Sequence, residues 1–272
     1  MAAELLDSMV TLSSGLTRVR VTGTGRPLVW THGFLNSVEV EEKLGLAELL
    51  LGLSGIRLVR YDARGHGRSE AGRDEVASAW SALGADLLEL ISTLGLERPV
   101  AGGASMGVAT TLHAAVRAPD SFAGMVLLIP PTAWETRKPQ ADLYRGGAEL
   151  VEARGIEAYL EATRAAFSAR PLPGFTPAML ETLLDGMRAK SALELARLLR
   201  GAAASDLPEP ARIRALGIPA LVIATRDDPG HPLSTAERLV ELLPTAELIV
   251  LRDLRDAAAQ RDTVMRFLER AR

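Results

Sequence analysis

Residues 103–107 read Gly-Ala-Ser-Met-Gly, between a short apolar run and a stretch of small residues with helical spacing. A serine on a tight strand-to-helix turn needs neighbours without bulk, which Gly103 and Gly107 provide. Such a turn presents the hydroxyl above a sheet, at the positive end of the following helix. The pattern predicts Ser105 as a nucleophile and the backbone N–H of Met106, the next residue, as a donor to an oxyanion.

The base that would activate this serine is not evident from the sequence. A serine hydroxyl is a weak nucleophile at neutral pH and needs a base beside it. The chain has four histidines, His32, His66, His113 and His231, and none follows residue 231. In a hydrolase with a serine on such a turn, the histidine normally comes last, after the serine and the acid. His113 follows Ser105 along the same predicted helix, too far along it to reach the hydroxyl.

The elements that must position Ser105 alternate between short apolar runs and helical patterns, which is typical of a parallel sheet with crossover helices. Strand-type runs cover residues 18–22, 27–31, 56–61, 99–102, 124–129, 219–225 and 247–251. Helical spacing covers residues 77–94, 108–117, 234–243 and 262–270. Residues 133–207 have helical spacing and no strand-type run, so we expect a helical insertion in a core made of 1–132 and 208–272.

Composition limits the classes of protein that fit. The chain has 272 residues, a net charge of −3 and no cysteine, which argues against a nucleic-acid partner and excludes disulfides and thiolate metal sites. No apolar stretch is long enough to span a membrane, and no basic segment precedes an apolar N-terminal one, so we expect a cytoplasmic protein. Only Asp227, Asp228 and His231 could gather around a metal, and we expect neither metal nor cofactor. A homodimer is one option that the sequence leaves open.

Several short motifs now stand in one order along the chain. They are Thr31-His32-Gly33-Phe34, the run from Asp62 to Ser69 that reads Asp-Ala-Arg-Gly-His-Gly-Arg-Ser, the serine turn, Asp228 ahead of Pro232, and Phe267-Leu268 in the last predicted helix. With these motifs the chain resembles the α/β-hydrolase superfamily over nearly its full length. The resemblance implies a mostly parallel eight-stranded sheet with helices on both faces, and a helical lid inserted after the sixth strand.

The resemblance also implies roles for individual residues. The amide of Phe34 becomes the second oxyanion donor, and His32 braces that loop. His32, Gly33 and Trp134 border the substrate pocket. For Trp134 an equally good interpretation is that its side chain packs at a hinge of the lid. The motif that begins at Asp62 implies a turn held by charged hydrogen bonds, with His66 structural. Asp228 takes the place of the acid, with Asp227 as its competitor, and the usual histidine position falls on Asp256.

Three interpretations of the base stay open. In the first, His231 is the base, oriented by Asp228 or Asp256; a catalytic triad is defined by geometry and not by chain order. In the second, the protein is a non-hydrolytic relative that binds a small hydrophobic ligand, with the ring of His231 in solvent. In the third, Ser105 works with water and with Asp256, whose pKa burial would have to raise strongly.

The leading hypothesis is a serine hydrolase that acts on a carboxylic ester, thioester or lactone through an acyl-enzyme. The alternative is a catalytically impaired relative, or an enzyme that uses the oxyanion donors for another reaction, because fold alone does not determine function. Either way the expected partner is a small molecule. The empty histidine position at Asp256 is the feature that separates the two.

Overall fold

The computed structural model describes residues 6–171 and 174–271, built around one eight-stranded sheet. Its strand order is β1-β2-β4-β3-β5-β6-β7-β8. The strands are β1 (Leu6–Leu12), β2 (Gly15–Thr22), β3 (Arg26–Thr31), β4 (Ile56–Tyr61), β5 (Val100–Ala104), β6 (Gly124–Leu128), β7 (Ala220–Thr225) and β8 (Ala246–Leu251). In this order β1 and β2 pair antiparallel, and the six strands from β4 across to β8, β3 included, run parallel to one another. This arrangement confirms the predicted architecture.

Strand β1 is the one strand of this sheet that the sequence did not predict. It lies at the edge, and its partly buried residues alternate, with Leu12 the most buried. Leu6 and Met9 are exposed apolar residues three positions apart, a spacing that resembles a helix more than a strand. Pairing with β2 therefore decides the conformation of this segment.

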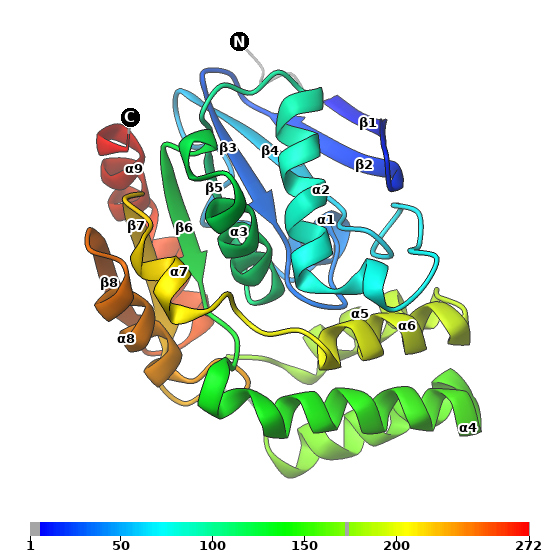
Figure 1. Cartoon of the computed structure of the whole chain (residues 1–272). Coiled ribbons are helices and arrows are strands. Elements are labelled where there is room, and N and C mark those ends of the chain that lie inside the picture. The colour runs from blue at the N-terminus through cyan, green and yellow to red at the C-terminus, as the bar shows by residue number, and fades with distance from the viewer. Residues whose placement is uncertain (1–5, 172–173, 272) are drawn as a thin grey trace.

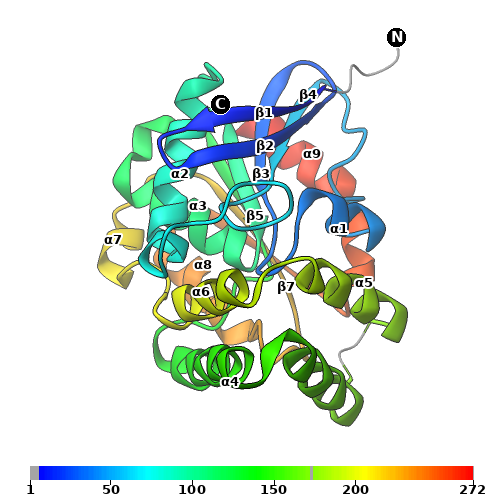
Figure 2. The same cartoon turned by 90° about the vertical axis from the view of Figure 1, so that its right-hand side faces the viewer.

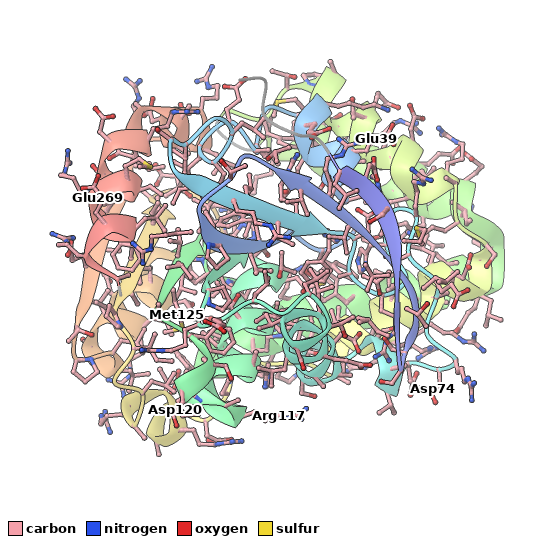
Figure 3. The ribbon with its side chains drawn as sticks, turned by 90° about the horizontal axis from the view of Figure 1, so that it is seen from above. Glu39, Asp74, Arg117, Asp120, Met125 and Glu269 are labelled. Carbon is pink, nitrogen blue, oxygen red and sulfur yellow. The ribbon has the colours of Figure 1, made fainter. Side chains whose placement is uncertain are left out.

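Helices cover both faces of the sheet, as predicted. They are α1 (Val38–Lys43), α2 (Trp80–Thr93), α3 (Met106–Arg117), α7 (Pro210–Arg214), α8 (Leu233–Leu242) and α9 (Arg261–Arg270). α2, α3, α7 and α8 contribute to one apolar core and α9 to the other (Figure 1). Figure 3 shows the molecule from above. In this view Glu39 of α1 and Arg117 of α3 lie on opposite sides of the sheet. A parallel sheet buried on both faces explains the unbroken apolar runs of β5, β6 and β7.

A separate group of helices follows β6 and precedes β7. It consists of α4 (Arg137–Ala169), α5 (Pro177–Arg188) and α6 (Ala192–Ala203). These helices share an apolar core of their own, which also takes in Leu35 from the loop after β3. In Figures 1 and 2 they lie beyond the carboxyl ends of the strands, with α5 and α6 between α4 and the sheet. Ligands of open α/β sheets bind at that edge, so the insertion stands over the expected site.

Candidate active site

Ser105 lies on a strained turn between β5 and α3. Its backbone has φ 52° and ψ −107°, a left-handed conformation that is costly for a residue with a side chain. A Cβ on Gly103 would lie 2.4 Å from the carbonyl oxygen of Thr31, and one on Gly107 would lie 2.1 Å from the same atom. The turn is held because the Ser105 N–H donates to Leu128 of the neighbouring strand, at 3.0 Å. The two glycines are therefore required by the close approach of β3.

His231 lies between Ser105 and Asp228. Its Nε2 is 2.8 Å from Ser105 Oγ, and its Nδ1 is 2.7 Å from Asp228 Oδ2. A carboxylate can only accept, so Nδ1 carries the proton and Nε2 accepts from the serine hydroxyl. The side chains of His231 and Asp228 are 22% and 19% exposed, which leaves the group reachable from outside.

A short loop after β7 brings the acid and the imidazole side by side. The His231 N–H donates to the carbonyl oxygen of Asp228, closing a turn, and Gly230 N–H donates to Asp228 Oδ1. Pro232 then caps α8 and ends the loop. Burial alone would raise the pKa of Asp228, but the imidazole of His231 and the backbone N–H groups of Gly230 and His231 outweigh burial, and the net pKa is lowered. Asp228 is therefore a carboxylate at neutral pH and orients the ring.

The loop after β3 lies against the nucleophile. A Cβ on Gly33 would stand 3.7 Å from the carbonyl oxygen of Ala104 and 3.9 Å from Ser105 Cβ. Phe34 follows directly, partly buried. Met106 is the first residue of α3, where N–H groups have no acceptor within the helix. The two amides predicted as oxyanion donors thus come from segments that flank Ser105.

His32 is buried and both of its ring nitrogens bond to backbone. Nδ1 lies 2.8 Å from the carbonyl oxygen of Gly33, and Nε2 accepts from Ala63 N–H at 2.9 Å. Burial lowers the pKa of His32, so the ring is neutral, with the proton on Nδ1. This is a brace between two loops; it leaves no ring nitrogen for the substrate contact that we also expected of His32. The pKa of His66, which packs on His32, is likewise lowered by burial.

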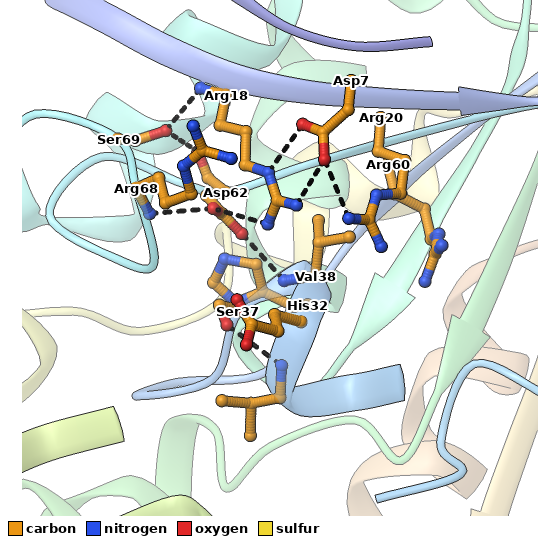
Figure 4. Close-up of polar contacts among 12 residues, drawn as sticks. Asp7, Arg18, Arg20, His32, Ser37, Val38, Arg60, Asp62, Arg68 and Ser69 are labelled. Atoms are coloured by element: carbon orange, nitrogen blue, oxygen red, sulfur yellow. Dashed lines mark hydrogen bonds and ion pairs between the residues drawn. The ribbon is translucent and has the colours of Figure 1, made fainter. Parts of the chain in front are cut away.

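The loop that begins at Asp62 is held by charged hydrogen bonds (Figure 4). Asp62 Oδ1 accepts from Val38 N–H at 2.8 Å, and Oδ2 accepts from Arg68 N–H at 2.9 Å. Arg18 lies 3.6 Å from the same carboxylate and makes two hydrogen bonds to Asp7. The acid thereby ties the Asp62 loop to the start of α1, just beyond the Gly33 loop.

Trp134 and Asp256 have contacts other than those that we expected of them. The indole N–H of Trp134 donates to Pro208 at 3.2 Å, and its backbone N–H donates to Asp206, so Trp134 joins the two ends of the helical insertion. This geometry favours the hinge interpretation over a substrate contact. Asp256 lies 3.6 Å from Arg252 and is 37% exposed. Both ring nitrogens of His231 have partners in Ser105 and Asp228, so Asp256 does not contact the ring, and this geometry argues against Asp256 as the base.

Tyr144 of α4 is a residue near the site that sequence reasoning missed. Its ring lies 5.1 Å from that of Phe34, edge to face, and the guanidinium of Arg137 lies over the Tyr144 ring, 5.5 Å from its centroid. Burial raises the pKa of Tyr144, so its hydroxyl stays protonated. Nothing in the helical pattern of 137–169 distinguishes Tyr144 from an ordinary packing residue, because its partner is distant in the chain.

The comparisons with known proteins agree with this fold. The sequence profile described as alpha/beta hydrolase fold matches residues 26–255, and the chain belongs to this family. A protein named as a carbamate hydrolase, RutD, of Agrobacterium fabrum is 31% identical over 203 residues, 72% of this chain and 74% of the relative.

Two other relatives point the same way. A 3-oxoadipate enol-lactonase of Acinetobacter baylyi is 24% identical over 204 residues, 75% of this chain and 73% of the relative. The crystal structure of an enol-lactonase from Burkholderia xenovorans LB400 superposes with a TM-score of 0.78 at 22% identity, covering 96% of this chain and 100% of that one. The prediction of a hydrolase of this fold is thereby confirmed.

The described residues hold no cluster of three or more acidic, histidine or cysteine side chains placed to bind a metal ion. Among the helices of these residues, none is long and apolar enough to cross a membrane.

Proposed function

We propose that the protein is a serine hydrolase in which Ser105, His231 and Asp228 form the catalytic triad. The observation that supports this most strongly is the continuous chain of hydrogen bonds from Ser105 Oγ through the imidazole to the carboxylate, 2.8 Å and 2.7 Å long. Distances in this range allow proton transfer between nucleophile and base. The acid and the base come from one loop, and a triad is defined by this geometry and not by chain order.

The reaction follows from the positions of these groups. Ser105 Oγ attacks the carbonyl carbon of the substrate while its proton passes to His231 Nε2, and Asp228 stabilises the imidazolium. The amides of Met106 and Phe34 donate to the oxyanion that forms. The intermediate collapses, the bond to the leaving group breaks, and the imidazolium protonates that group. Water then attacks the acyl-enzyme with the same base, releasing the acid and restoring the serine.

The substrate we propose is a carboxylic ester or a lactone, with thioesters as chemically related candidates. All three react through the acyl-enzyme described above. The relatives named as an enol-lactonase and a carbamate hydrolase support carbonyl substrates of small size. We also propose that α4–α6 act as a lid, since Tyr144 of α4 packs on Phe34 beside the nucleophile.

The test combines covalent labelling with turnover. Wild type, Ser105→Ala and His231→Ala are treated with a fluorophosphonate probe, and the labelled residue is located by mass spectrometry. The same proteins are assayed with p-nitrophenyl acetate and butyrate. We expect one label on Ser105 in wild type, none in Ser105→Ala, and labelling and turnover at least 100-fold slower in His231→Ala. Turnover by His231→Ala at the wild-type rate refutes the assignment; a folded wild type without labelling or turnover supports the binding-protein alternative.

A further inference from the structure

A cavity of about 320 Å³ lies beside the proposed triad, on the side of β8. We call it the β8-side cavity. Asp228 is part of its wall, and so is Ile129, the residue after Leu128, whose carbonyl accepts the Ser105 N–H. Two of its lining residues are thus neighbours of the reacting group. The rest of the wall comes from the end of β7 and the loop that follows it, the loop after α1, the segment that leads into α5 with the first turn of that helix, and the loop after β8.

The loop after β8 forms a large part of the wall of this cavity. The family resemblance placed the base in this loop, near Asp256. In this chain the loop contributes Arg252, Asp253 and Leu254 to the cavity wall, and the imidazole next to Ser105 comes from the loop after β7 instead. The loop after β8 therefore supplies cavity wall, and the loop after β7 supplies the imidazole.

The wall of the β8-side cavity is mostly apolar. Its large apolar side chains include Leu46, Leu49, Ile129, Phe175, Met179 and Leu254. The volume falls at the lower end of the range for small-molecule sites, ~300–1,000 Å³. At about 30 Å³ for each water-sized group, it accommodates on the order of ten non-hydrogen atoms.

The charges around the cavity are predominantly negative. Four carboxylates line it, those of Glu48, Asp227, Asp228 and Asp253, against the two guanidinium groups of Arg252 and Arg255. Arg255 is bound to Asp253, and Arg252 faces Asp256. Among the described residues, Glu48 and Asp227 have no cation within ion-pair distance. An anionic group inside the cavity would therefore meet four carboxylates and two guanidinium groups that already have acidic partners, Asp253 and Asp256.

We propose that the β8-side cavity holds the acyl chain of the substrate and selects a neutral, apolar chain of up to about eight carbons over a chain that ends in a carboxylate. This proposal rests on the proposed hydrolase function, because the acyl carbon must reach Ser105. Burial of the chain against Leu46, Met179 and Leu254 supplies the affinity. The carboxylates of the wall reject a terminal charge.

The first experiment measures binding without turnover. Sodium octanoate, butyrate and octanedioate are titrated into Ser105→Ala protein by calorimetry. We expect octanoate to bind at least tenfold more tightly than butyrate and than octanedioate, which has the same number of carbons but a second carboxylate. Equal affinity for octanoate and octanedioate overturns the selection against charge. Equal affinity for octanoate and butyrate overturns the acyl site itself.

The second experiment fills the cavity from two different elements, with Met179→Trp on α5 and Leu254→Trp in the loop after β8. The matched control is Leu193→Trp, on the exposed face of α6 and outside the cavity wall. We expect the ratio of kcat/KM for p-nitrophenyl octanoate to that for the acetate to fall at least tenfold in both filled variants and to stay unchanged in the control. Retained acetate turnover shows that the filled variants are folded. An unchanged ratio in both refutes the proposal while leaving the hydrolase function intact.

The two proposals fail in different ways. If wild type neither labels nor turns over any ester, the hydrolase function fails. The cavity is then tested by binding alone: octanoate should bind the Ser105→Ala protein, and this binding should be lost when Met179→Trp is added. If esters are hydrolysed but the binding and chain-length results go against the cavity, only the acyl site is overturned.

Discussion

Replacing Asp228 by asparagine tests the proposed triad most directly, because it changes one atom type and keeps the shape. Asp228 Oδ2 accepts from His231 Nδ1 at 2.7 Å, and this bond keeps Nε2 free to accept the proton of Ser105. An amide NH₂ at this position donates to Nδ1 and favours the other tautomer, in which Nε2 carries the proton and cannot act as a base. Loss of the base through the wrong tautomer costs about 10⁴ in kcat in the Ser-His-Asp template, which equals roughly 5 kcal/mol at the barrier.

The assay is steady-state hydrolysis of p-nitrophenyl acetate, with circular dichroism to show that each variant is folded. Asp256→Asn is the matched control: the same change of carboxylate to amide, on a residue that faces Arg252 and not the imidazole. We expect Asp256→Asn to keep kcat within about twofold and Asp228→Asn to lose about four orders of magnitude. Equal rates for Asp228→Asn and wild type refute the triad. A large loss in Asp256→Asn revives the carboxylate base.

Three further predictions concern stability, measured by chemical unfolding. Gly107→Ala lowers the free energy of unfolding by roughly 3 kcal/mol or more, because its Cβ would lie 2.1 Å from Thr31 O. The control is Gly146→Ala, which is neutral or stabilising because a Cβ on Gly146 would meet open space. Equal effects of the two substitutions would contradict the argument from the close approach of Thr31. Arg137→Ala costs roughly 3 kcal/mol, since it removes two hydrogen bonds to the segment that ends α6 and leaves the buried carbonyl of Ser205 without this donor; an unchanged midpoint would show that Arg137 does not anchor the insertion. Burial raises the pKa of Glu41 from 4.5 to about 7, so the folded state binds more protons between these values and stability falls as pH rises through them. Glu41→Gln removes roughly 3 kcal/mol of this pH dependence between pH 4 and 8, and parallel stability curves for the two proteins would refute it.

The short motifs were predictable from sequence because each is constrained by its own backbone. Gly103 and Gly107 are required by the approach of β3, and the carboxylate of Asp62 accepts from the amide of Arg68, a residue that the motif itself contains. The buried strands were predictable because a sheet covered on both faces leaves apolar runs. Edge strand β1 was missed because its pattern resembles a helix and only its pairing with β2 decides it.

The identity of the base was open in the sequence for a different reason. Ser105 and His231 are 126 positions apart, and no local pattern says whether a loop histidine faces its distant partner or solvent. The choice between Asp228 and Asp227 as the acid was likewise open in the sequence. The structure decides it, because the N–H groups of Gly230 and His231 bond to Asp228.

The amino-acid sequence by itself determined the family, the serine turn and the order of the elements, since these depend on backbone geometry and apolar periodicity over a few residues. Only the tertiary structure decided which side chains meet: His231 with Ser105, Tyr144 with Phe34, and Asp256 with solvent and Arg252. Such contacts depend on how a whole sheet and its loops pack, and a change of a few ångströms in one loop alters the partner without altering any local pattern.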